Sequence, residues 1–229
     1  MPHNDLTVLY EDRSLVLCVK PVGVLSEDSD SAASMPALLR AHYRSLHQPD
    51  YIATVHRLDK ITGGLMLFSR SKAATGKLIA AVAEHRVEKE YLAVLTGVPQ
   101  QPDGVLEDLL LRDRQAQKTV VVRTPGPDTR PARLSYRVLA QAGGKSLVLI
   151  RLETGRTHQI RAQFSSRGLP LYGDRKYGAP DEGPLALWSY RISFLHPQTG
   201  RPMTFSHTPP AVCPWTLFPG SSYDSISAS

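Results

Sequence analysis

Residues 56–68 read His-Arg-Leu-Asp-Lys-Ile-Thr-Gly-Gly-Leu-Met-Leu-Phe, a charged segment that passes through a glycine turn into an apolar strand. Asp59 lies between two cations, Arg57 and Lys60. Flanking positive charge keeps a carboxylate ionised even when it is partly removed from water, and the two glycines let a substrate backbone come close. The segment therefore predicts a functional carboxylate at Asp59, although an isolated aspartate of this kind is more often part of a structural ion pair.

Apolar alternation on both sides of this segment predicts a sheet. Strands are expected at Leu6–Tyr10, Leu15–Lys20, Leu65–Phe68, Glu90–Thr96, Lys118–Arg123, Ala132–Ala140, Ser146–Leu152 and Trp188–Leu195. Helical spacing predicts helices over Met35–His47, over 71–85 with Ser71 as N-cap, and over Thr157–Ser166. Because short loops join consecutive strands, most pairs should be antiparallel. The predicted class is α/β of the α+β kind, a mixed and largely antiparallel central sheet flanked by helices.

The 229 residues, of which 41% are hydrophobic and 21% charged, have the composition of a globular protein. We expect one catalytic domain over 1–229, with its core at 6–208, a mobile loop at 26–34 and a frayed tail at 221–229. No stretch approaches the roughly 18 apolar residues that a membrane helix requires, and the N-terminus has no signal pattern. We therefore expect no membrane partner and a cytoplasmic location.

The charge balance favours a polyanionic partner. The chain has 27 basic and 21 acidic residues, a net charge of +6 and a sequence pI near 9.4. Its arginines recur beside the turns, as in His-Arg-Leu-Asp-Lys and Gly-Arg-Thr-His-Gln-Ile-Arg, whereas an ordinary solvated surface would scatter them more evenly. This placement strengthens the case for a nucleic acid without proving it.

A second polar segment, residues 153–161, reads Glu-Thr-Gly-Arg-Thr-His-Gln-Ile-Arg. A glycine turn here precedes a helix whose first turn exposes Arg, His and Gln, an arrangement that suits a phosphate or a carboxylate. Taken alone, the segment is equally well explained as a polar helix start. It carries no nucleophile-elbow, phosphate-loop or dinucleotide pattern.

The sequence predicts neither a metal site nor a cofactor. His56 and His158 each lack a second His, Cys or acidic ligand at helical or short-loop spacing. Cys18 and Cys213 form no CxxC motif and no disulfide framework, so we expect inert thiols.

Three segments in this order identify a family. Residues 56–71 (HRLDKITGGLMLFSRS), 88–97 (EKEYLAVLTG) and 152–178 (LETGRTHQIRAQFSSRGLPLYGDRKYG) together closely resemble the RluA-like family of RNA pseudouridine synthases, and the resemblance extends over residues 6–208. It implies the pseudouridine synthase fold. It also implies isomerisation of specific uridines in structured RNA, ribosomal or transfer, without metal or cofactor.

The resemblance also assigns roles to individual residues. Asp59 would be the essential carboxylate, which attacks or removes a proton. Tyr91 would stack on the target base and carry a proton, and Arg161 would pair with Asp59 and hold it ionised. Arg57 would enter the stack that the flipped uridine leaves. The remaining residues implied in substrate binding are His56, Thr62, Arg156, His158, Arg167 and the segment 172–178.

Two departures from the family pattern are visible. The family commonly has Thr-Ser-Gly where this chain has Thr62-Gly63-Gly64, and Trp188 stands where a His is usual. We expect these to alter the fit of the substrate more than the chemistry. We further expect a monomer, and an N-terminal extension too short for an S4 domain.

Two other functions stay open at this point. One is a catalytically silent RNA-binding module of the same fold, which the intact Asp59, Tyr91 and Arg161 disfavour. The other is a nucleosidase or glycosidase, but no second carboxylate motif of the kind used in such hydrolysis is present.

Overall fold

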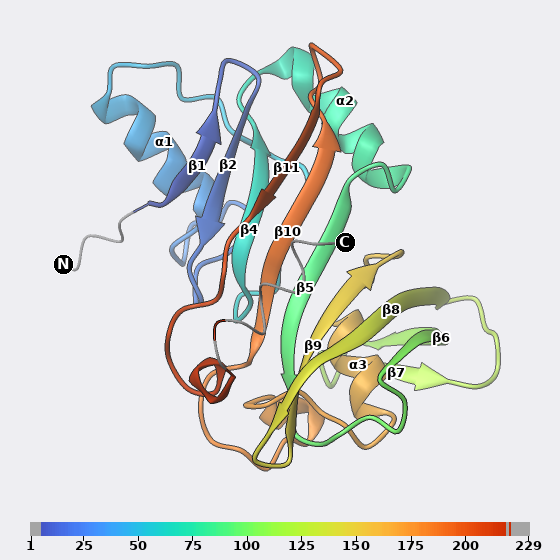
Figure 1. Ribbon diagram of the computed structural model, residues 1–229. Coiled ribbons are helices and arrows are strands. Elements are labelled where there is room, and N and C mark those ends of the chain that lie inside the picture. Colours follow the sequence, from blue (N-terminus) through green and yellow to red (C-terminus); the bar gives the residue numbers. More distant parts are fainter. Residues whose placement is uncertain (1–5, 219, 221–229) are drawn as a thin grey trace. The chain divides into compact units, whose positions relative to one another are not determined.

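A computed structural model of the chain describes residues 6–218 and residue 220 (Figure 1). These residues form two compact units. The first comprises residues up to 89 together with 189–208, and the second comprises 90–188 with the described part of 209–220. The frayed tail predicted at 221–229 lies outside the described residues.

The first unit contains a sheet with the strand order β1-β2-β4-β10, in which β3 also pairs with β4 and β11 with β10. The strands are β1 (Val8–Glu11), β2 (Leu15–Lys20), β3 (Ala53–Thr54), β4 (Gly63–Ser69), β10 (Leu187–Leu195, of which the first two residues belong to the second unit) and β11 (Pro202–Ser206). The β1–β2, β2–β4, β3–β4 and β10–β11 pairs are antiparallel.

Two capped helices accompany this sheet. Ser34 precedes α1 (Met35–Ser45) and accepts from the Ala37 N–H, while Ser71 precedes α2 (Lys72–Ala83) and accepts from the Ala74 N–H, so the predicted N-cap at Ser71 is confirmed. The apolar stripe of α2 packs with strand residues in one core. This core includes Leu15, Leu17, Leu65, Leu67, Ala74, Leu78, Ala81, Ile192 and Phe194. The strand that follows the Asp59 turn is thereby fully buried.

The second unit contains strands in the order β5-β9-β8-β6-β7. They are β5 (Glu88–Leu95, of which the first two residues belong to the first unit), β6 (Asp103–Asp113), β7 (Lys118–Val122), β8 (Thr129–Ala142) and β9 (Lys145–Leu152). The helix α3 (Gln159–Ser165) and the short 3₁₀ helices η1 (Arg175–Tyr177) and η2 (Trp215–Leu217) complete it. Ala162 of α3 and Tyr177 of η1 pack on Leu110 of β6 and Ala132 of β8.

The predicted fold class is confirmed, with a mixed and mostly antiparallel sheet and flanking helices. No strand was predicted between Thr96 and Lys118, so β6 was missed, and the turn-forming residues Asp103 and Gly104 lie in this interval. They begin β6, opposite Arg137 and Tyr136 of β8. Turn-forming residues here are overridden by cross-strand pairing.

Two shorter strands, β3 and β11, were also missed. The segment 26–34, predicted as a mobile loop, is closed at its base. The Leu25 N–H donates to Ala33 at 2.9 Å, and the Met35 N–H donates to Leu25 at 2.8 Å. None of the helices in the described part of the chain is long and apolar enough to cross a membrane.

Candidate active site

Hydrogen bonds within the first unit hold the turn that carries Asp59 from both sides. The Oγ of Ser26 donates to the Leu58 carbonyl at 2.7 Å and accepts from the Leu58 N–H at 3.0 Å. After Asp59, the Thr62 N–H donates to the Asp59 carbonyl at 3.0 Å. Asp59 itself is half-buried. The carboxylate is therefore presented from a braced turn.

A buried cation supports the same turn. Lys20, the last residue of β2, is 0% exposed, and its Nζ donates to the carbonyls of Pro21, Val24 and Lys60 at 3.0, 2.7 and 3.1 Å. Burial lowers the pKa of Lys20 to about 8, and the negative charge of Asp59 acts in the opposite direction. Lys20 thus ties the residues after β2 to the turn, within electrostatic reach of Asp59.

His56 lies inside the first unit. Its side chain is buried, and its Nε2 accepts a 3.0 Å hydrogen bond from the Leu67 N–H of β4. Burial, and secondarily the charge of Lys89, lowers the pKa of His56 to about 3, so the ring is neutral at physiological pH. Its Nδ1 has no hydrogen-bond partner within the described residues. The geometry gives His56 the role of a brace between the turn and β4.

Gly64 is required by the close approach of two strands. Its φ is +112°, and a Cβ at this position would lie 2.4 Å from the carbonyl oxygen of Ser189 on β10. The expectation that a substrate backbone approaches Gly64 is therefore wrong. The backbone that leaves no room for a side chain at Gly64 is that of Ser189 on β10. Thr62, two residues earlier, is buried, and its Oγ1 has no partner among the described residues.

Arg57 lies on the solvent side of the turn. Its side chain is 61% exposed, and its Nη1 donates to Oε2 of Glu27 at 2.8 Å, where Glu27 is itself 56% exposed. An ion pair this exposed contributes little stability. The guanidinium can therefore exchange Glu27 for another anion at small cost.

The second unit contains a buried ion pair. Arg161 of α3 donates from Nε to Oδ2 of Asp174 at 2.7 Å and from Nη2 to Oδ1 at 2.8 Å. Both residues are 2% exposed. The Arg161 guanidinium also lies over the ring of Tyr177, with its Cζ 4.8 Å from the ring centroid. The orientation of Arg161 is thus fixed by a carboxylate and by an aromatic face.

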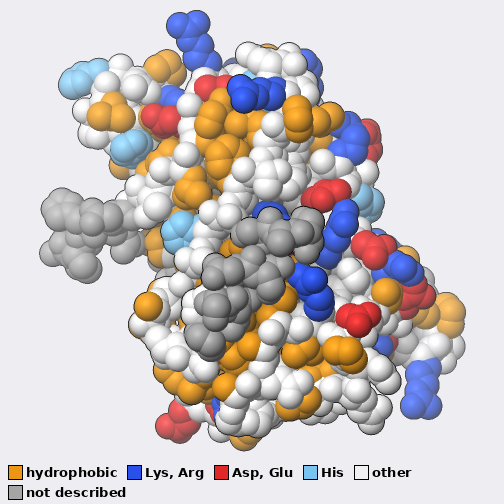
Figure 2. All heavy atoms as spheres, in the orientation of Figure 1, with side chains coloured by type: hydrophobic (Ala, Val, Ile, Leu, Met, Phe, Trp, Pro, Cys, Tyr) orange, Lys and Arg blue, Asp and Glu red, His pale blue; other side chains and the backbone are white. Residues whose placement is uncertain are grey.

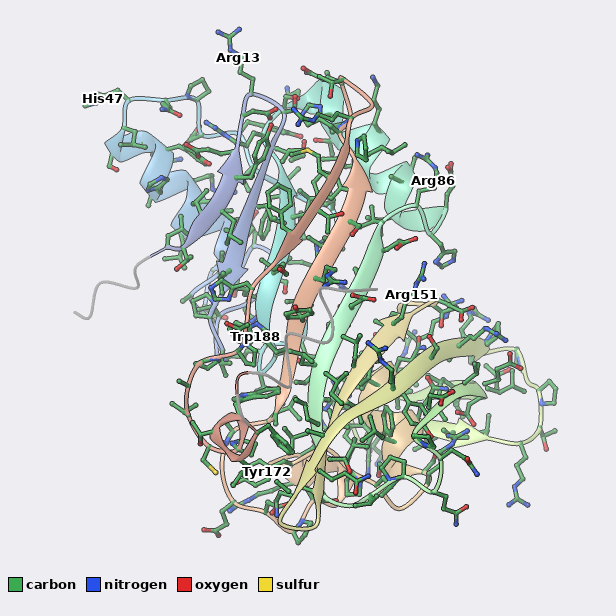
Figure 3. The ribbon with its side chains drawn as sticks, in the orientation of Figure 1. Arg13, His47, Arg86, Arg151, Tyr172 and Trp188 are labelled. Carbon is green, nitrogen blue, oxygen red and sulfur yellow. The ribbon has the colours of Figure 1, made fainter. Side chains whose placement is uncertain are left out.

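Tyr91 and Trp188 are buried aromatic residues of the second unit. Tyr91 lies on β5 and is 6% exposed, and Trp188, labelled in Figure 3, lies on β10 and is 7% exposed. Both rings are therefore largely enclosed by the surrounding protein.

His158 is the N-cap of α3 and adopts the left-handed conformation, with φ of +54°. Its Nδ1 lies 2.9 Å from the Tyr177 hydroxyl, which already accepts from the Thr119 N–H at 2.8 Å. The Tyr177 hydroxyl thus links the N-cap residue of α3 to β7. Arg156 is exposed, and its Nε donates to the Pro131 carbonyl at 3.1 Å.

Arg167 pairs with a carboxylate at the edge of an open groove. Its Nη1 and Nη2 donate to the two oxygens of Asp108 at 2.9 and 3.2 Å. The groove has a volume of about 870 Å³, and Arg123 and Arg133 also line it. Arg133 is paired with Glu153, and Figure 2 shows basic and acidic side chains interleaved on this unit. The charges of Arg167 and Arg133 are therefore each partly neutralised by a neighbouring carboxylate.

Within residues 6–218, no three His, Cys, Asp or Glu side chains are grouped so that they could hold a metal ion. Cys18 is buried, and burial raises the pKa of its thiol to about 12, whereas Cys213 is exposed.

Residues 14–166 match the family model described as RNA pseudouridylate synthase. The chain belongs to this family. It is 33% identical over 217 residues to the ribosomal large subunit pseudouridine synthase D of Neisseria meningitidis serogroup A, a match that covers 87% of this chain and 57% of that protein. It is 32% identical over 212 residues to the dual-specificity RNA pseudouridine synthase RluA of Salmonella typhimurium, covering 87% and 91% of the two chains. This chain therefore spans less than two thirds of the Neisseria relative.

Solved structures of pseudouridylate synthase domains share the fold. The structure of human RNA pseudouridylate synthase domain containing 1 aligns with a TM-score of 0.78 at 23% identity, covering 98% of this chain and 96% of that one. The structure of human RNA pseudouridylate synthase domain containing 4 aligns with a TM-score of 0.76, also at 23% identity, covering 89% and 88%.

In this pseudouridylate synthase family member, four of the predicted site residues lie on one braced turn of the first unit: His56, Arg57, Asp59 and Thr62. Of these, Arg57 is exposed and Asp59 half-buried, whereas the other two are buried. The other five predicted site residues belong to the second unit: Tyr91, Arg156, His158, Arg161 and Arg167. The pairing of Asp59 with Arg161 stays a prediction.

Sequence reasoning missed three supporting residues of this pseudouridylate synthase site. Lys20 was counted only as the end of a strand, because lysine at such a position is ordinarily exposed and its burial follows only from the fold. Asp174 and Tyr177 were included in a segment expected to contact phosphates. The structure buries both of them against Arg161, so direct phosphate contact is not their role.

Proposed function

We propose that this chain is an RNA pseudouridine synthase that isomerises specific uridines of structured RNA, ribosomal or transfer, with Asp59 as the catalytic carboxylate. Family membership over residues 14–166 is the observation that carries the proposal. The two relatives described above are named as synthases, one for the ribosomal large subunit and one of dual specificity.

The reaction that this proposal assigns is balanced within the substrate. The bond between C1′ and N1 of uridine breaks, a bond between C1′ and C5 forms, C5 loses its hydrogen and N1 gains one. A carboxylate suits the step because it can attack an electron-deficient centre or remove a proton. The braced turn of Asp59 supports this role, since a backbone turn that Ser26 and Lys20 hold on both sides of Asp59 needs little reorganisation when the substrate binds.

The same proposal assigns roles to the other predicted site residues. Tyr91 stacks on the target base, and Arg161 pairs with Asp59 and keeps it ionised and oriented. Arg57 enters the stack that the extruded uridine leaves, which its exposed and weakly held guanidinium favours. Arg156, His158 and Arg167 contact the RNA backbone. His56 and Thr62 act from within the protein, as their burial suggests.

Asp59→Asn tests the proposal. The variant should lose pseudouridine formation by at least about a thousandfold, because bond breaking requires the carboxylate, while the Kd for RNA should stay within about threefold, because affinity comes mainly from cations on phosphates. Asp50→Asn, which removes an aspartate from the exposed pair with Arg44, is the matched control and should keep full turnover.

Transcribed ribosomal and transfer RNA serve as substrates, and the products are analysed as nucleosides and by RNA mass. Pseudouridine at unchanged RNA mass supports isomerisation. Loss of the base would indicate a nucleosidase, and unchanged RNA in the presence of binding would indicate a silent RNA-binding module. Substantial turnover by Asp59→Asn would remove Asp59 from the mechanism.

A further inference from the structure

A buried ion pair of the second unit joins Arg161, which has an assigned role in the proposed reaction, to Asp174, which has none. Arg161 belongs to the proposed reaction, whereas Asp174 lies thirteen residues later, beside η1, and touches Arg161 through two parallel hydrogen bonds of 2.7 and 2.8 Å. Two such bonds fix both the position and the plane of a guanidinium, which a single contact does not.

The contact leaves most of the guanidinium outside the pair. Arginine carries five N–H donors, and Asp174 takes Nε–H and one N–H of Nη2. The other three N–H groups lie in the same rigid plane, so fixing the plane also fixes their directions. Asp174 therefore determines the direction from which another anion can bind the Arg161 guanidinium.

The carboxylate is itself held in place. Gly173, immediately before it, has φ of +73°, and a Cβ there would lie 2.3 Å from the carbonyl oxygen of Pro184. After it, the Asp174 carbonyl accepts from the N–H groups of Tyr177 and Ala179 at 2.9 and 3.1 Å. The backbone on both sides of Asp174 is thus constrained, so its side chain is a fixed reference for Arg161.

The other contact of Arg161 is equally fixed. The ring of Tyr177 lies under the guanidinium, and its hydroxyl accepts from the Thr119 N–H and lies 2.9 Å from Nδ1 of His158. Asp174 sets the plane of the guanidinium from its edge, and Tyr177 limits its movement from one face.

We propose that Asp174 is a positioning residue of the synthase reaction, which holds the Arg161 guanidinium in the orientation that Arg161 needs to act on the catalytic carboxylate. The inference rests on the proposed function of this chain. It adds a residue that acts through Arg161 and itself contacts neither the RNA nor the reacting atoms. A displacement of about 1 Å in a catalytic group can cost up to about a hundredfold in rate, so a residue that only orients can be nearly as important as one that reacts.

The experiment measures steady-state kcat and KM on a substrate RNA for full-length wild-type protein and variants, with kcat normalised to the folded fraction from thermal melts. Asp174→Asn keeps the shape but loses the charge and one acceptor. Its kcat should fall about tenfold to a hundredfold, with KM within about twofold of wild type. A purely structural role would lower the folded fraction and leave kcat per folded molecule unchanged.

Asp181→Asn is the matched control. It breaks another ion pair of the second unit with low exposure, in which Lys145 Nζ lies 3.1 Å from Oδ1 of Asp181 and the side chains are 23% and 17% exposed. Its kcat should equal that of wild type. A loss as large as that of Asp174→Asn would show that any broken ion pair in this unit slows the reaction, and would overturn the proposal.

A double variant tests whether Asp174 acts through Arg161. Adding Asp174→Asn to Arg161→Gln should lower kcat no further than Arg161→Gln alone, whereas multiplicative losses would contradict the proposal. If Asp174→Asn does not fold, Asp174→Glu keeps the charge but moves the carboxylate. A reduced kcat at unchanged KM supports the role, and wild-type kcat overturns it. A wild-type chain without turnover on any RNA overturns the proposed function itself, and with it this role.

Discussion

The Leu67 N–H donates a 3.0 Å hydrogen bond to Nε2 of His56, so a ring next to the Asp59 turn accepts a hydrogen bond from the strand that follows the turn. The accepting nitrogen must stay unprotonated for this bond to exist. Protonation of His56 would therefore both place a charge in the core and break the bond to β4.

Stability should consequently fall in mild acid. The pKa of His56 is about 3 in the folded protein against an ordinary 6.5, so between these values the unfolded chain binds a proton that the folded one does not. The free energy of unfolding then decreases as pH falls through this window, by about 2 kcal/mol between pH 6.5 and about pH 5.

Urea unfolding at about pH 7.5 and about pH 5 checks this, with His56→Gln as the reference variant. Glutamine has no proton to take up, so the stability difference between wild type and variant should shrink in acid by about 2 kcal/mol. Parallel behaviour of the two proteins would mean that His56 is already protonated or solvated.

Gly64→Ala should destabilise the protein by more than about 3 kcal/mol. The added Cβ would lie within 3 Å of three backbone atoms of Ser189, and the φ of +112° is unfavourable for alanine. Gly76→Ala is the control, because Gly76 is inside α2 with nothing within 4 Å of the added carbon. It should stabilise by up to about 1 kcal/mol. Equal effects in thermal melts would contradict the close approach at Gly64.

Arg161→Ala and Asp174→Ala should each cost about 3–5 kcal/mol of folding stability, because each leaves the partner charged and buried without the other. The double variant should be less destabilised than the sum of the two, since it removes both charges. Denaturant unfolding of all four proteins gives the coupling energy. Strict additivity would show that the pair contributes no mutual stabilisation.

Removing Glu27 should strengthen RNA binding. Glu27→Gln takes away the anion that competes for Arg57, and affinity at low salt should rise about twofold to fivefold. Arg57→Ala should weaken binding and reduce the slope of log Kd against log salt by about 1.

The control for charge alone is Glu84→Gln. Glu84 forms an equally exposed pair with Arg86, which is labelled at the surface in Figure 3. An increase in affinity as large as that of Glu27→Gln would assign the effect to net charge, and would argue against a role of Arg57 in binding.

Local sequence determined the elements whose cause is itself local. The strand after the glycine turn follows from a run of apolar residues, and the start of α2 follows from a serine that can accept a hydrogen bond from the helix N–H groups. The order of the three motifs determined the family for the same reason, because residue type and spacing are properties of the chain alone.

Tertiary structure decided what depends on burial and on distant partners. β6 was missed because Leu106 and Leu110 gain a buried face only when β8 lies beside them. The brace at His56 requires β4 to fold against it, since no sequence pattern states whether an imidazole is in water or in a core.

The partner of Arg161 was decided in the same way. Asp174 lies in a glycine-rich segment whose charges all suggest a solvated surface, yet the fold buries this carboxylate against α3. The sequence determined that a carboxylate, a tyrosine and an arginine are present in the family's positions. Which groups hold them in place depends on desolvation and on contacts between residues far apart in the chain, and those exist only once it has folded.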